Sequence, residues 1–169
     1  MSIWIRAVCT KSIGELGALD LRAATKDADF QMWAEQAGLA DEVGKAAENQ
    51  LRFEVGGPNL VFLRYQPTER FIRVERWSGA EAREELGELA EEIEDLTSVG
   101  ASRVRQVLAS AVDSVAFELK QSDADGMGWS IAWQTAMWIA QRGEGLVQTD
   151  QEQWWDPDQY KVIVDYGRA

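Results

Sequence analysis

The stretch "LRFEVGGPNLVFLRYQPTERFIRVERW", residues 51–77, decides the fold. Three apolar-rich segments within it, 51–55, 60–66 and 70–77, are each bounded by turn-forming residues and predict three strands. The two connections, "GGPN" and "PTE", are short and rich in Gly, Pro, Asn and Thr, as hairpin loops are. Parallel strands would need a longer crossover, so the stretch predicts an antiparallel meander.

Further strands are expected on both sides of the meander, at 3–9, 113–120, 145–149 and 160–166. A helix over 127–143 is apolar almost all round, which indicates a central, covered position. The strand, helix and strand within 113–149 are compatible with one parallel crossover. A shorter helix is predicted over 102–112.

Two helical regions have sequence signals at their ends. Thr25, with acids in the following turn, is expected to open a helix that Gly38 ends, and a weaker helix follows over 39–49. Ser78 and Glu81 have the spacing of a capping box in front of "AEAREELGELAEEIEDL", residues 80–96. A stripe of apolar residues at helical spacing gives this second helix one buried face: Ala82, Leu86, Leu89, Ile93 and Leu96.

These elements predict an α+β fold. A chain of 169 residues suits one domain with one core, and neither a repeat nor a linker divides it. We expect residues 1–169 to form a single domain, in which a mostly antiparallel sheet of about five to seven strands is packed by the two long helices.

Composition excludes several function classes. The formal net charge of −12 argues against nucleic acid and anionic membranes as partners, because both are bound by basic residues. Histidine is absent and Cys9 is the single cysteine, which removes Ser-His-Asp and Cys-His catalysis and the usual zinc sites. No apolar run approaches the roughly 20 residues of a membrane span, and the start of the sequence does not resemble a signal peptide. We therefore expect a cytoplasmic protein without metal or cofactor.

The helix over 80–96 is the strongest surface feature. Its window from Glu81 to Asp95 holds eight acids and one base, Arg83. Such a face is either a solvated surface that maintains solubility or a docking face for a basic partner. Like charges four residues apart repel one another, which hints that the negative field has a use. The candidate partner-binding residues on this helix are Glu84, Glu85, Glu88, Glu91, Glu92 and Asp95. The meander has the opposite balance, and its arginines are expected to pair with the acidic helix or across strands.

A second candidate site is the turn predicted around Trp154 and Trp155. Adjacent residues of an extended chain point to opposite faces, so we expect one ring to cover the 127–143 helix and the other to lie at an exposed rim. Trp154, Trp155, Asp156 and Asp158 would then anchor a partner. The carboxylates of this region, with Asp150 and Glu152, are alternatively a metal or catalytic cluster, although their spacing is not diagnostic. The loop at 122–128 lacks the key carboxylates of an EF-hand and the lysine of a P-loop.

The C-terminal third, "GMGWSIAWQTAMWIAQRGEGLVQTDQEQWWDP" (126–157), resembles the endings of small bacterial proteins, among them immunity partners of polymorphic toxins. The resemblance rests on an apolar helix, the segment "GEGLVQTD" and an aromatic-acidic turn, and covers less than a third of the chain. It implies a small cytoplasmic protein that covers an essential surface of a toxin. No residue role can be carried over from it.

The sequence thus favours a stoichiometric protein-binding module for a basic partner, in particular an immunity protein. Two alternatives remain: a small enzyme that uses two carboxylates with separated pKa values, and a structural or oligomerising domain.

Overall fold

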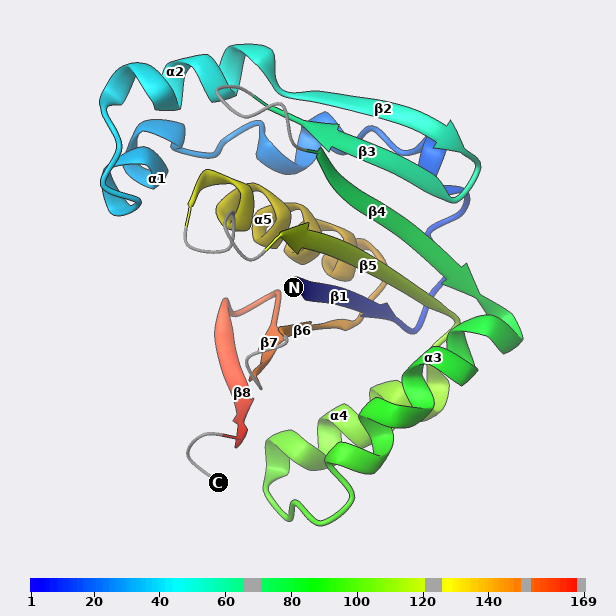
Figure 1. Ribbon diagram of the computed structural model, residues 1–169. Helices are drawn as coiled ribbons and strands as arrows, with labels where there is room; N and C mark the ends of the chain where they lie inside the picture. The colour runs from blue at the N-terminus through cyan, green and yellow to red at the C-terminus, as the bar shows by residue number, and fades with distance from the viewer. Residues whose placement is uncertain (66–70, 121–125, 150–152, 167–169) are drawn as a thin grey trace.

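The computed structural model describes residues 1–65, 71–120, 126–149 and 153–166. They form one sheet of eight strands in the order β2-β3-β4-β5-β1-β6-β7-β8 (Figure 1). The strands are β1 (Ser2–Cys9), β2 (Arg52–Gly57), β3 (Leu60–Arg64), β4 (Phe71–Ser78), β5 (Asp113–Lys120), β6 (Leu146–Thr149), β7 (Gln153–Asp156) and β8 (Lys161–Asp165). Every neighbouring pair is antiparallel. The α+β class and the antiparallel sheet are confirmed, whereas the expected five to seven strands are too few.

The predicted meander forms β2, β3 and β4. Val61 and Leu63 of β3 pair with Val74 and Ile72 of β4, and all four side chains are buried. A register shift between Val55 and Gly57 bends β2 at the edge of the sheet. Part of the second connection, residues 66–70, lies outside the described residues. Alternation of buried and exposed positions thus fixes the register of the meander.

The first strand of the chain lies in the middle of the sheet. β1 pairs with β5 over its full length, from Ser2 opposite Lys120 to Cys9 opposite Asp113, and with β6 on its other side. β5 and β6 run in the same direction because both are antiparallel to β1. The expected crossover over 113–149 therefore has parallel strands, but β1 separates them.

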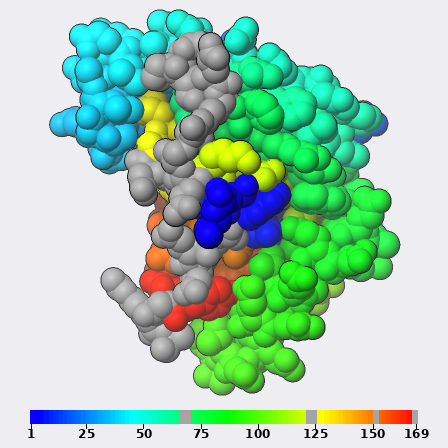
Figure 2. Space-filling view, viewed as in Figure 1, coloured from blue at the N-terminus to red at the C-terminus, as the bar shows by residue number. Residues whose placement is uncertain are grey.

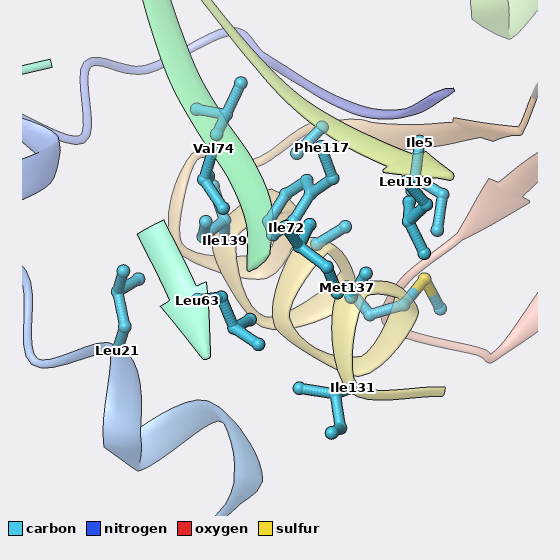
Figure 3. Close-up of a cluster of buried hydrophobic side chains, with 14 of the residues drawn as sticks. Ile5, Leu21, Leu63, Ile72, Val74, Phe117, Leu119, Ile131, Met137 and Ile139 are labelled. Atoms are coloured by element: carbon cyan, nitrogen blue, oxygen red, sulfur yellow. The ribbon is translucent and has the colours of Figure 1, made fainter. Parts of the chain in front are cut away.

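Helix α5 (Met127–Arg142) covers one face of the sheet. Figure 3 shows side chains of β3, β4 and β5, among them Leu63, Ile72 and Phe117, gathered over this helix with its Met137 and Ile139. The same face is completed by two 3-10 helices, η1 (Leu16–Ala18) and η2 (Leu21–Thr25), and by α1 (Phe30–Gln36) and α2 (Asp41–Gln50). The central position expected for α5 is confirmed.

Helices α3 (Gly79–Glu92) and α4 (Val99–Ser110) cover part of the opposite face. They bury Leu86, Leu89 and Val104 against Val8 of β1 and Leu146 of β6. Figure 2 shows α3 and α4 (green) as one continuous surface at the lower right, away from α1 and α2 (cyan). The sheet is thus covered by helices on both faces in its β1–β6–β7 region.

Strand β7 corrects the prediction of a turn around the tryptophan pair. Trp154 pairs with Gln148 of β6, and Trp155 pairs with Val147. Both faces of the sheet are covered here, so a strand with two adjacent large apolar residues is buried from both sides. The polar residues around the pair suggested a turn. Two of them, Gln153 and Asp156, are the first and last residues of this short strand.

The helix ends differ in part from their sequence signals. The N-cap of α1 is Asp29, which accepts a bond from the backbone N of Met32 at 2.9 Å, and not Thr25, which ends η2. Gly38 ends α1 as expected, with φ of 73° and the paired backbone bonds of a Schellman motif, from Gly38 to Glu35 and from Leu39 to Ala34.

Helix α3 begins after Ser78 as predicted, but the Ser78 side chain makes no capping bond, and the helix ends at Glu92 rather than near residue 96. Arg105 of α4 donates from Nη1 to the carbonyl oxygens of Ile93 and Leu96. These bonds satisfy backbone acceptors that the end of a helix leaves without a partner.

Candidate functional site

The solvent face of α3 and the turn after it present five of the ten predicted partner-binding residues. The exposed five are Glu84, Glu88, Glu91, Glu92 and Asp95. The helix has this orientation because Leu86 and Leu89, on its other face, are buried against the sheet and α4. Among the described residues, Glu84, Glu88 and Glu91 have no ion-pair partner. Their charges therefore act outward into the solvent.

A polar groove of about 480 Å³ lies between α3 and the sheet. Its lining consists of Arg6, Glu85, Glu88, Leu89, Glu92, Gln148 and Tyr166. Arg6 lies at the centre of the interactions in this groove. Its Nε donates to Glu85 Oε1 at 2.7 Å, and its Nη1 donates to Gln148 Oε1 at 3.0 Å. The groove thus has one fixed guanidinium beside three carboxylates.

Glu85 has a different position from the other acids of α3. The hydroxyl of Ser114 on β5 donates to Glu85 Oε2 at 2.6 Å, while Arg6 occupies Oε1. The side chains of Arg6 and Glu85 are only 18% and 22% exposed. Glu85 therefore fastens α3 to the sheet, and its predicted role as a free docking group does not agree with its contacts.

The tryptophan pair points to opposite faces, as expected, but neither ring forms an exposed rim. Trp155 packs edge-on against Trp133 of α5 with ring centroids 5.6 Å apart, which confirms that one ring covers this helix. Trp154 is fully buried on the α4 side of the sheet, and its Nε1 donates to the Tyr166 hydroxyl at 2.7 Å. The expectation that the other ring lies at an exposed rim is wrong, because α3 and α4 cover the face to which Trp154 points.

Asp156 is also structural. It is buried at the end of β7 and lies 2.6 Å from Arg103 Nη1 of α4. Its Oδ1 accepts bonds from the backbone N of Asp158 and of Gln159. Burial alone would raise the pKa of this carboxyl, but the bonds from Arg103 and the two backbone groups outweigh burial and lower it. Asp156 is therefore held as a carboxylate that closes the β7–β8 turn, while Asp158 is exposed.

The predicted carboxylate cluster is described only in part. Asp150 and Glu152 lie outside the described residues. Asp123 and Asp125, in the 122–128 loop that was compared with an EF-hand, lie outside them too. Within the described ranges, no three acidic or cysteine side chains gather as a metal ion would require. In the same part of the chain, no helix combines the length and the apolar character needed to cross a membrane.

Two arginines of the meander, Arg64 and Arg76, pair across strands of the sheet, as one of the two alternatives predicted. Arg76 Nη2 lies 2.8 Å from the buried Asp113 of β5. Arg64 lies 2.9 Å from Glu54 of β2, an ion pair by distance that lacks the angle of a hydrogen bond. In these two pairs the acids come from neighbouring strands and not from α3.

The sequence did not indicate three residues of the groove, Arg6, Gln148 and Tyr166. Gln148 is on β6, and Tyr166 immediately follows β8. Gln148 reaches the groove because β1, which carries Arg6, pairs with β6. Alternation along β1 places Arg6 on the face of Val8, but nothing in the sequence says which strands lie next to β1.

The fold and the groove define an α+β protein with an eight-stranded antiparallel sheet and one strongly acidic helical surface. Comparison with models of known protein families, with curated proteins and with solved structures gives no match.

Proposed function

We propose that this protein is a stoichiometric protein-binding module that holds a basic partner against α3 and the neighbouring groove. The observation that carries the proposal is the row of exposed carboxylates on α3, of which Glu84, Glu88 and Glu91 have no ion-pair partner among the described residues. A helix selected for stability alone would mix Glu with Lys, because like charges four residues apart cost a few tenths of a kcal/mol each.

The groove supports the same proposal. Glu88 and Glu92 border it from α3, and Leu89 supplies apolar surface beside them. A lysine or arginine side chain of a partner would find the Glu88 carboxylate for its charge and the apolar surface of Leu89 for its stem. Long-range attraction speeds the encounter of such a pair, and short-range contacts slow its release.

Within this class, we propose a cytoplasmic immunity protein that blocks a toxin with a basic surface. Support comes from the acidic charge of −12 and from the resemblance of the C-terminal third. The groove does not support the enzyme alternative. Its half-buried carboxylate belongs to Glu85, and both oxygens of that carboxylate are already bonded, one to Arg6 and the other to Ser114.

The test uses the polypeptide encoded by the neighbouring reading frame as the candidate partner. We expect a one-to-one complex whose association rate falls as salt screens the charges. Reversal of Glu84, Glu88 and Glu91 to Lys should lower the association rate about tenfold or more, measured by stopped-flow fluorescence.

The matched control changes three exposed acids elsewhere to Lys: Glu35 of α1 and Glu42 and Glu48 of α2. This control variant has the same net charge as the α3 variant. The control should bind nearly as the original protein does. Equal association rates for the two triple variants would remove α3 as the docking face, since net charge alone would then govern the encounter.

A further inference from the structure

A second hollow lies on the other side of the molecule from α3, and its lining is aromatic and acidic. It measures about 570 Å³ and is bordered by η2, α1, α5 and the β7–β8 turn. Three aromatic rings line it, those of Trp33, Trp138 and Tyr160, and Met32 adds a soft apolar side chain. The volume lies in the range of sites for small organic molecules.

The polar groups of this hollow are mostly acceptors. Asp27 and Asp29 contribute two carboxylates, and no Lys or Arg of the described part of the chain belongs to the lining. Asp29 uses one oxygen to cap α1, which leaves the other. The Nε2 of Gln134 donates to the carbonyl oxygen of Ala24 and to the Tyr160 hydroxyl, both at 3.4 Å, so Gln134 keeps its amide oxygen as an acceptor. A ligand that fits these groups brings donors and positive charge.

Tyr160 is held in this lining at a conformational cost. Its φ of 50° lies in the left-handed region that favours Gly or Asn and disfavours a ring-bearing residue. Its side chain is 46% exposed, and its ring meets Trp133 at a centroid distance of 5.7 Å. Strained, half-exposed aromatic residues of this kind occur where a side chain serves a site. The strain therefore supports a use for this ring beyond closing the turn.

One aromatic ring of the hollow already binds a cation within the chain. The guanidinium of Arg142 lies over the Trp138 ring at 4.7 Å from its centroid. Electron-rich ring faces attract ammonium and guanidinium groups, and cages of such rings recognise quaternary ammonium ions. In this hollow three aromatic rings are combined with two carboxylates.

We propose that this hollow is a binding site for an organic cation, an ammonium group carried on an apolar stem. Trp33, Trp138 and Tyr160 contact the stem and the charged head, and Asp27 supplies the counter-charge. The site is separate from α3 and does not depend on the function proposed for that helix.

The test titrates the full chain with choline and with its neutral isostere 3,3-dimethylbutanol. The two compounds have the same shape and differ in charge. Binding is followed by tryptophan fluorescence and by the indole N–H resonances. We expect choline to bind with a Kd of about 1 mM and the neutral isostere to bind at least about tenfold more weakly. Equal binding of the two compounds overturns the proposal, because the site would then recognise shape without charge.

A parallel titration with n-butylammonium, which has the stem of a lysine side chain, distinguishes two sources of the cation. Tighter binding of butylammonium than of choline assigns the site to a lysine of another chain, and the reverse order assigns it to a free quaternary amine. Absence of binding of both cations up to tens of millimolar rejects the site.

Three variants complete the test. Asp27→Asn should weaken choline binding about threefold to tenfold, whereas Glu35→Gln, which removes an exposed charge of α1 outside the hollow, should not change it. Tyr160→Asn removes the ring and suits the left-handed backbone, so it should lose binding without a lower Tm. Full binding by the folded Tyr160→Asn protein contradicts the role of the ring.

Discussion

At the scale of single residues, arginine side chains hold the elements of this acidic protein together. Arg6 joins α3 to β1, Arg76 joins β4 to Asp113, and Arg103 joins α4 to the end of β7. A planar guanidinium with several donors suits such internal bonds. Because these bases are paired with Glu85, Asp113 and Asp156, they do not pair with the exposed acids Glu84, Glu88 and Glu91 of α3. The same residues that stabilise the fold thus leave the surface acidic.

Cys9 allows a residue-scale prediction. Burial, together with the charge of Asp113, raises the pKa of its thiol from 9.0 to about 12. The folded-state pKa thus lies above the unfolded-state value, so its contribution to stability is complete below about pH 9 and is lost as the pH rises towards 12. We expect an aromatic disulfide reagent to label Cys9 at about pH 8 only after denaturant is added.

Cys9→Ala provides the control for this prediction. All other groups are the same in the two proteins, so the loss of stability between about pH 9 and pH 11 should be smaller in the variant by the contribution of the thiol. Urea unfolding at several pH values measures both proteins. Rapid labelling of the native protein, or the same pH slope in both proteins, would contradict a buried neutral thiol.

At the scale of elements, the sequence predicted best those segments whose pattern has a single interpretation. Both ends of β5 were predicted to the residue. Val115, Phe117 and Leu119 occupy alternate positions, and polar residues stand at both ends of the segment. β7 was missed because Trp154 and Trp155 pack on opposite faces of the sheet, and a strand of four residues with acids around it resembles a turn. The acids of α3 were found because they are local in sequence. The groove beside α3 was not found, because its walls come from strands that only the tertiary order brings together.

Glu85 tests whether α3 is fastened by one side chain. Glu85→Ala removes the acceptor of both Arg6 and Ser114 and should cost about 1–3 kcal/mol in the free energy of unfolding. Glu84→Ala, one position earlier on the exposed face, should change it by less than about 0.5 kcal/mol. Urea denaturation of both variants measures the difference. Equal stability of the two would mean that the Arg6–Glu85 contact is not a tether.

Two helical glycines make a matched pair for the packing of α4. A Cβ on Gly100 would lie 1.8 Å from the carbonyl oxygen of Ile163, whereas a Cβ on Gly87 of α3 meets nothing within 4 Å. Gly100→Ala should therefore force α4 away from β8 and destabilise the protein by about 3 kcal/mol. Gly87→Ala should stabilise it by about 0.5–1 kcal/mol, because it removes backbone freedom from an exposed helical position. Thermal unfolding separates the two, and stabilisation by both substitutions would show that α4 does not lie against β8.

At the scale of the whole molecule, β1 is the element on which the two parts of the sheet depend. On one side of it, β2 to β5 follow one another in chain order, and on the other side so do β6 to β8. Among the described strands, only β1 joins these two groups by strand pairing, and it comes from the start of the chain. The groove beside α3 depends on it too, because β1 carries Arg6 between Ala116 of β5 and Gln148 of β6. The acidic site is therefore complete only when the first strand is in place.

Hydrogen exchange tests this central role. The amides of residues 5–8 lie between β5 and β6, so exchange should require global unfolding, with an opening free energy close to that of the whole domain. β2 and β8 lie at the two edges of the sheet and should exchange through local fraying, about 100-fold faster or more. Mass spectrometry of peptic fragments, or NMR in a low concentration of urea, provides the rates. Exchange of β1 at the rate of β8 would mean that the two groups of strands stay folded without their central strand, and the groove could not then depend on its insertion.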